Sequence, residues 1–146
     1  MKAGTSALVA MITLFATPVF SDELADGIAA IPGAVEDVRI GGTWQNDDKS
    51  GVYRIAIART GGNAVTARMF VQWIAYGDSG SSTVEHSMEI AEFDELDLDV
   101  VDYLSESDTE GLSIYIEAID PESGSDEQYE LFVFGRDDYR FGTASN

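Results

Sequence analysis

Residues 64–76 read AVTARMFVQWIAY, and residues 83–93 read TVEHSMEIAEF. Apolar and polar side chains alternate with a period of two in both stretches, which is the pattern of a β-strand with one face in a core. In the first stretch the second face is also partly apolar, which predicts a central strand covered on both sides. The Gly- and Ser-rich segment Gly77–Ser82 between them predicts a hairpin loop. The side chains predicted to face the core are Val65, Ala67, Met69, Val71, Trp73, Val84, His86, Met88 and Ile90.

The rest of the chain repeats this pattern and contains no convincing long helix. Turn clusters such as Thr60–Asn63 separate short runs that are alternating or rich in β-branched and aromatic residues. About seven strands at regular spacing predict an all-β fold, an antiparallel immunoglobulin-like β-sandwich. The alternative is a small up-and-down calycin-like β-barrel. The runs cover residues 38–44, 52–59, 64–76, 83–93, 96–100, 112–119 and 128–134.

The first residues have the features of an export signal. Lys2 precedes an apolar run over residues 7–16, and the small residues Val19 and Ser21 suit a signal peptidase. An uncleaved membrane anchor is the rival interpretation, but the apolar stretch is short for a span. We therefore predict a signal peptide at 1–21 and a periplasmic or secreted protein. The mature chain is divided into a linker with a possible short helical turn at 22–36, a single sandwich domain at 37–141 and a flexible tail at 142–146.

The charge balance excludes several classes of partner. The 146 residues include 27 Asp and Glu against 8 Lys and Arg, for a formal net charge of −19. Nucleic acid and anionic membrane surfaces are poor partners for such a chain, because both are recognised through Lys and Arg. The chain has no cysteine, which excludes disulfides, Cys-ligated metals and a thiol nucleophile. Repulsion among the acids predicts raised carboxyl pKa values and a fold that salt stabilises.

Catalysis is not predicted. Gly77–Gly80 reads GDSG, which resembles the nucleophile loop of trypsin-like proteases. A serine nucleophile needs a histidine base held by an acid, and the only histidine, His86, follows Ser79 by seven residues. The chain is also too short for the two barrels of such a protease. We therefore expect a protein that is not an enzyme.

A small basic and aromatic group of residues is the predicted partner site. Arg54 and Arg68 fall on neighbouring predicted strands, and Tyr, Trp and Arg dominate binding hot spots. The alternative roles are cross-strand ion pairs of the arginines with Glu85 or Glu89, and a core-edge His86 packed on Trp73. The leading function is a non-catalytic protein-binding or structural module of the cell envelope, with another envelope or extracellular protein as partner. The predicted partner-binding residues are Tyr53, Arg54, Arg68, Trp73 and His86.

Two other functions remain open. Gly42-Thr43-Trp44 resembles the opening Gly-x-Trp of the calycin barrels, the lipocalin and avidin-like binders, and this resemblance implies a small-molecule-binding barrel carrier. A cavity lined by Trp44 and Trp73 would support it. The acidic loop between the last two predicted strands suggests weak calcium binding, since hard cations take several oxygen ligands from one loop. Its candidate ligands are Asp120, Glu122, Asp126 and Glu127, and no other cofactor is expected.

Overall fold

The computed structural model describes residues 22–145, in two units. The short helix α1 (Glu23–Ala29) belongs to a unit that ends at Ile31, and a β-sandwich unit begins at Pro32. The predicted signal peptide at 1–21 lies outside the described residues. No helix within the described part of the chain is long and apolar enough to cross a bilayer.

Helix α1 is capped by Asp22. The Asp22 carboxylate accepts hydrogen bonds from the backbone N–H groups of Leu24 at 3.1 Å and Ala25 at 3.4 Å, which satisfies donors that the first helical turn leaves free. Pro32 follows the helix and prevents its continuation. The helical turn predicted for this segment is confirmed, and it extends to seven residues.

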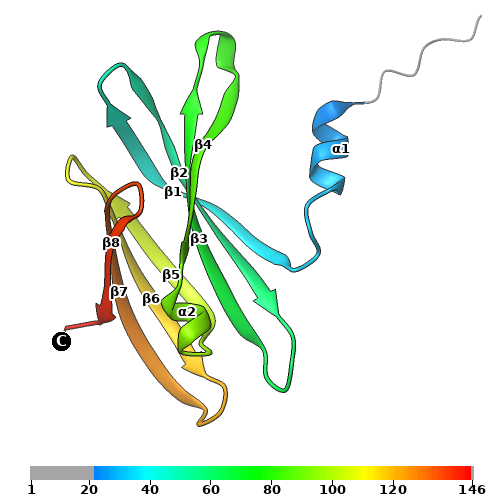
Figure 1. The fold of residues 1–146 in the computed structure, drawn as a ribbon, viewed down its shortest axis with the longest axis vertical. Helices are drawn as coiled ribbons and strands as arrows, with labels where there is room; N and C mark the ends of the chain where they lie inside the picture. The colour runs from blue at the N-terminus through cyan, green and yellow to red at the C-terminus, as the bar shows by residue number, and fades with distance from the viewer. Residues whose placement is uncertain (1–21, 146) are drawn as a thin grey trace, which may run out of the picture. The chain divides into compact units, whose positions relative to one another are not determined.

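The sandwich unit contains eight strands in the described residues, arranged in two four-stranded antiparallel sheets (Figure 1). The all-β sandwich prediction is confirmed, with one strand more than expected. The calycin-like closed barrel is wrong, because hydrogen-bonded pairing stops at the edges of each sheet. The first sheet contains β1 (Val35–Asn46), β2 (Lys49–Thr60), β3 (Thr66–Tyr76) and β4 (Ser82–Ile90). The second contains β5 (Asp99–Ser107), β6 (Leu112–Asp120), β7 (Ser125–Gly135) and β8 (Asp138–Thr143).

Each sheet is a meander in which strands pair in chain order. In immunoglobulin domains the strands of the two sheets are interleaved along the chain, whereas here the sheets are formed by consecutive halves. The connection between them contains the short helix α2 (Glu92–Glu95). Its Phe93 is fully buried and packs edge-on against Phe141 of β8, with ring centroids 5.4 Å apart.

One hydrophobic core fills the space between the sheets. The alternating residues of β2 and β3 face it as predicted, and Ile55, Met69 and Val71 are fully buried. From the second sheet, Ile114 and Leu131 meet them with almost no exposure. The predicted alignment of Trp73 with His86 is also confirmed by the pairing of β3 with β4.

The period-two prediction fails where the backbone departs from a regular strand. Glu85 is an extra residue in β4, between the pairs Trp73↔His86 and Ile74↔Val84. This bulge turns Val84 outward, so that it is 52% exposed instead of buried.

The run at 96–100 is not a strand from end to end. Asp97 adopts a positive φ of 50° and makes a turn, so Leu96 is exposed while Leu98 is buried. Three segments differ from their predicted state. Strand β4 stops at Ile90, β5 extends to Ser107 into the predicted loop, and Asp138–Thr143 forms β8, where no strand was predicted.

Side chains, and not a hydrogen-bonded ladder, join the edges of the two sheets. Beside β1, the Arg39 guanidinium bonds the carboxylate of Asp102 at 2.8 Å, and the Thr43 N–H donates to the Ser107 hydroxyl at 2.9 Å. At the other edge, the Tyr139 hydroxyl donates to Glu92 at 2.8 Å. These links hold β1 near β5 and the end of β4 near β8. No backbone ladder joins the strands of either pair.

Candidate functional site

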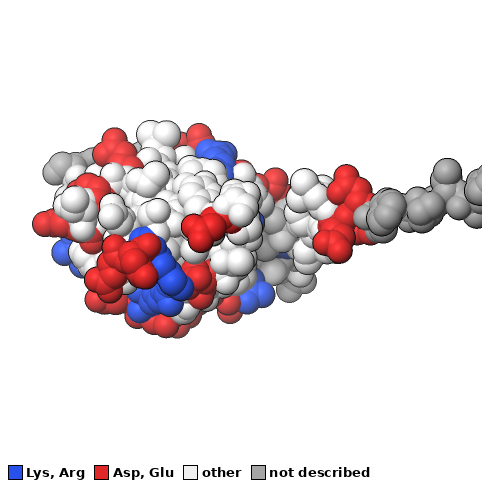
Figure 2. Space-filling model, turned by 90° about the horizontal axis from the view of Figure 1, so that it is seen from above, with Lys and Arg blue, Asp and Glu red and all other residues white. Residues whose placement is uncertain are grey.

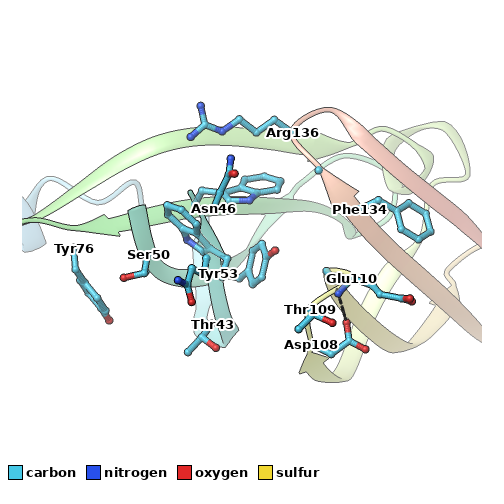
Figure 3. A pocket seen from close by; sticks show the side chains of 16 residues that line it. Thr43, Asn46, Ser50, Tyr53, Tyr76, Asp108, Thr109, Glu110, Phe134 and Arg136 are labelled. Carbon is cyan, nitrogen blue, oxygen red and sulfur yellow. Dashed lines mark hydrogen bonds between the residues drawn. The ribbon is translucent and has the colours of Figure 1, made fainter. Parts of the chain in front are cut away.

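A cleft of about 990 Å³ opens at one end of the sandwich, where the β1–β2, β5–β6 and β7–β8 turns approach one another (Figure 3). This end is at the top of Figure 1. Small-molecule sites of proteins have volumes of roughly 300–1,000 Å³. The lining residues come from both sheets, so the cleft exists only when the sandwich is assembled.

The floor of the cleft consists of three aromatic side chains from the first sheet. Trp44, Tyr53 and Trp73 are each less than a tenth exposed, and they are held in place by their neighbours. The Trp44 indole N–H donates to the Val52 carbonyl at 3.1 Å, and the rings of Tyr53 and Trp73 meet edge to face at 5.6 Å. Burial raises the pKa of Tyr53. The floor is therefore preformed, with fixed rings.

Two further aromatic side chains in the lining are open to solvent. Tyr76, at the end of β3, is 56% exposed, and Phe134, near the end of β7, is 54% exposed. Figure 3 shows them on opposite sides of the view, with Asn46 and Tyr53 between them. A ligand can reach these two rings without any change in the core.

Two glycines allow the backbone to approach closely beside the cleft. A Cβ at Gly51 would lie 1.8 Å from the Ile74 carbonyl oxygen. A Cβ at Gly111 would lie 2.0 Å from the Val133 carbonyl oxygen, and Gly111 also has a φ of +148°, which favours glycine. A side chain at either position would clash with the backbone of the neighbouring strand.

Two of the three charged side chains that line the cleft, Asp108 and Arg136, are already engaged. The Asp108 carboxylate accepts from the N–H groups of Glu110 at 2.8 Å and Gly111 at 3.2 Å, which fixes the β5–β6 turn. Arg136 and Lys49 both contact Glu85, at 3.4 and 3.1 Å, so one carboxylate connects turns of both sheets. These cations, Lys49 first, lower the pKa of Glu85.

The predicted rise of carboxyl pKa values is wrong for every described acid that has a resolved shift. Arg68 lowers the pKa of Glu89, and Arg39 lowers the pKa of Asp102. Net charge counts the basic residues but does not say where they lie. The fold instead places them beside acids, as the blue and red side chains of Figure 2 show for one end of the molecule.

The five predicted partner-binding residues do not form one patch. Tyr53 and Trp73 face the core, whereas Arg54 and Arg68 lie on the outer face of the first sheet. Arg54 donates to the Gln72 side chain at 2.8 Å. Arg68 makes two hydrogen bonds of 2.6 Å with Glu89, so its expected cross-strand ion pair is confirmed.

His86 lies at the edge of the core. Its ring packs edge to face on Trp73 with centroids 5.2 Å apart, and its Nε2 lies 2.9 Å from the Asp137 carboxylate. No serine hydroxyl bonds this ring among residues 22–145. Ser79, the serine of the GDSG sequence, lies in an exposed turn with a φ of 72°.

The acidic loop that suggested calcium binding is a self-contained turn. The Asp120 carboxylate accepts hydrogen bonds from the Ser123 hydroxyl at 2.7 Å and the Glu122 N–H at 2.8 Å, and these donors lower its pKa. Asp126 and Glu127 belong to β7. Nowhere in the described chain do three His, Asp or Glu side chains gather closely enough to hold a metal ion. The weak calcium site is therefore not supported.

Sequence reasoning identified Trp44 and Trp73 as a potential binding wall but missed Tyr76, Phe134 and Arg136. Their signal is the position of an aromatic or basic residue at a strand end next to a glycine. Which strand ends meet depends on the sheet order, which the pattern does not contain. No protein-family model, curated protein or solved structure was found to match this chain.

Proposed function

We propose that this protein is a non-catalytic binding module that holds a small uncharged ligand in the cleft. The observation that supports it is the convergence of both tryptophans of the chain with Tyr76 and Phe134 in one cleft of about 990 Å³. An aromatic lining with a few polar groups is typical of ligand sites. The small-molecule alternative thus gains support, in an open cleft in place of a barrel interior.

The chemistry of the lining favours a ligand with an apolar face and several hydroxyl or amide groups. Aromatic rings offer flat apolar surfaces that C–H groups can cover. Hydroxyl and amide side chains can donate and accept hydrogen bonds around the rim. Short saccharides combine both properties, so we propose an uncharged oligosaccharide. The polar side chains of the rim are Thr43, Gln45, Asn46, Ser50 and Thr109.

The charge of the molecule argues against an anionic ligand. Asp108 and Glu110 oppose the single arginine of the lining, and the whole chain has a formal charge of −19. Because Arg136 already contacts Glu85, it is not free to neutralise an acidic group without losing that contact. An uncharged sugar is not repelled by the negative potential of the protein.

The same contacts support a role in binding and not in catalysis. A general acid or base needs a titratable side chain free to reach the substrate. In the lining, Asp108 is bonded to its own turn and Arg136 to Glu85, which leaves Glu110 as a single carboxylate with no second acid or base free to act with it. We place this binding function outside the cytoplasm, on the basis of the predicted export signal.

Tryptophan fluorescence provides the test, because both tryptophans of the chain line the cleft. Neutral di- to tetrasaccharides are titrated into residues 22–146, and thermal melting is followed in parallel. We expect at least one sugar to change the emission and raise the melting temperature. Phe134→Ala and Tyr76→Ala should weaken its binding about tenfold, which corresponds to the loss of about 1.4 kcal/mol.

Leu104→Ala is the matched control, because Leu104 is an exposed apolar residue that does not line the cleft. It should leave the affinity unchanged. The proposal fails if no sugar in the panel binds, or if the cleft variants bind as tightly as the Leu104 control.

A further inference from the structure

The outer face of the second sheet has an apolar centre surrounded by acids, on a surface separate from the cleft. Leu104 is 72% exposed and Tyr115 is 44% exposed, and they pair directly across β5 and β6. Both belong to strands whose alternate residues are in the core. We call this surface the β5–β7 face; its residues are Leu104, Glu106, Tyr115, Glu117, Gln128 and Glu130.

The acids of this face have no partner within the described molecule. The side-chain carboxylates of Glu106, Glu117 and Glu130 make no hydrogen bond or ion pair in residues 22–145. Glu117 lies beside Gln128 and Glu130 beside Tyr115, so no cation is their cross-strand neighbour. This face therefore carries negative charge that no cation of the described chain balances. Its apolar side chains are also exposed to solvent.

No basic residue of the described chain forms an ion pair with the acids of this face. All seven described Lys and Arg side chains already have partners. Five of them form ion pairs with acids, Arg54 bonds Gln72, and Arg140 stacks on Phe132 at 4.8 Å. A partner molecule that carries positive charge would complement these carboxylates.

The size of the face selects a segment over a globular partner. Three strands at about 4.8 Å spacing and about four residues along each strand define an area of roughly 10 by 14 Å. That is far below the roughly 800 Å² per partner of a standard interface. A second copy is disfavoured both by this area and by its own charge of −19.

We infer that the β5–β7 face binds a basic amphipathic helix of a partner protein. A helix is about 10–12 Å wide, so it can lie across the strands with an apolar stripe on Leu104 and Tyr115. Lysines on its two flanks would reach the carboxylates while their stems cover apolar surface. A depression of about 240 Å³ lined by Leu104, Tyr115 and Gln128 has room for one apolar side chain.

The experiment uses a labelled peptide of about 14 residues, a helix about 21 Å long, with a leucine stripe and flanking lysines. A second peptide of equal charge has serine in place of leucine. Binding to residues 22–146 is measured by fluorescence anisotropy at near-physiological salt, where non-specific attraction is screened. We expect the leucine peptide to bind at least about tenfold more tightly than the serine peptide.

Matched variants distinguish binding at this face from attraction by the overall charge of the protein. Leu104→Ser with Tyr115→Ser, and Glu106→Gln with Glu117→Gln, should each weaken binding about tenfold. Two control proteins carry changes of similar exposure elsewhere: Val84→Ser, and Glu95→Gln combined with Glu122→Gln. Both should bind like the parent protein. All the side chains are exposed, so circular dichroism should be unchanged.

Three outcomes of the peptide binding measurements would overturn the inference. They are the absence of peptide binding, equal losses in the face and control variants, and equal affinity for the two peptides. A dimer in sedimentation that Leu104→Ser abolishes would identify a second copy as the occupant and would also reject it. The sugar titration is independent, since neither Leu104 nor Tyr115 lines the cleft.

Discussion

Replacing Tyr103 by phenylalanine should stabilise the protein, although it removes a polar group from a well-packed position. Tyr103 is 4% exposed, and its hydroxyl is buried without a hydrogen-bond partner among the described residues. A buried polar group with no partner costs about 1–3 kcal/mol. Tyr103→Phe keeps the ring in the core and the Arg39 guanidinium 4.5 Å above it, so we expect the free energy of unfolding at pH 7 to rise by about 1–3 kcal/mol.

Tyr139→Phe is the matched control and should have the opposite sign. The Tyr139 hydroxyl donates to Glu92 at 2.8 Å and accepts from the Ala91 N–H at 3.4 Å. Losing these bonds should cost about 0.5–1.5 kcal/mol, the net value of a typical hydrogen bond. Urea unfolding followed by tryptophan fluorescence and circular dichroism measures both variants on one scale.

The pH dependence of Tyr103→Phe provides a second measurement. Burial raises the pKa of Tyr103 to about 12, whereas an unfolded tyrosine titrates near 10. The folded state therefore keeps a proton that the unfolded state releases, and stability is lost as pH rises from about 10 to 12. Two pKa units at about 1.36 kcal/mol each give a loss of roughly 2–3 kcal/mol, which the phenylalanine variant should escape.

The other buried tyrosines titrate equally in both proteins, so their contributions cancel in the difference. The reasoning is refuted if Tyr103→Phe is no more stable than the parent at pH 7. It is also refuted if the gap between the two proteins fails to widen above pH 10. Either result would mean that the hydroxyl is satisfied in the folded protein.

Three further predictions concern the turns, the acids and the N-terminus. Gly51→Ala should destabilise the protein by about 1–3 kcal/mol, because the added Cβ would meet the Ile74 carbonyl oxygen. Gly142→Ala should be neutral or slightly stabilising, because nothing lies within 4 Å of its Cβ. Thermal melts of the two variants measure the difference. The folded-state pKa values of Glu85 and Glu89 lie below 4.5, so these carboxylates contribute fully to stability above that pH. Their contribution is lost as the pH falls through the lower folded-state pKa values. The melting temperature should therefore decline below about pH 4.5 and not increase. Mass spectrometry of the exported protein should find an N-terminus at Asp22, and an intact chain in the membrane fraction would contradict cleavage.

The alternation of side chains was sufficient to predict most of the sandwich, because a half-buried strand needs a period of two. Met69, Val71 and Ile90 are buried for this reason. The pattern fails at Val84 and Leu96, where a bulge and a positive φ change which side a residue faces. Such irregularities depend on the pairing partner, and a single strand does not encode its partner.

The candidate cleft could be predicted only in part for the same reason. Trp44 and Trp73 stand out because tryptophan is rare, but their meeting with Phe134 depends on the order of two sheets. The opposite error affected Tyr53 and Arg54, which adjoin in sequence and face opposite sides of one strand. Adjacency along a strand separates side chains in space, so a patch cannot be assembled from neighbours in the sequence.

Because the two sheets are consecutive meanders, the residues of the first sheet are synthesised before those of the second. All four strands of the first sheet are complete at Ile90, before any residue of the second sheet is synthesised or translocated. Until β5–β8 arrive, Ile55, Met69 and Ile90 form an uncovered apolar surface, the kind of surface that a holding chaperone recognises. During synthesis from the N-terminus, the apolar face of the first sheet is therefore exposed until the second sheet of the same chain covers it. A cut at the exposed turn of Asp97 would therefore separate the residues of the first sheet from those of the second.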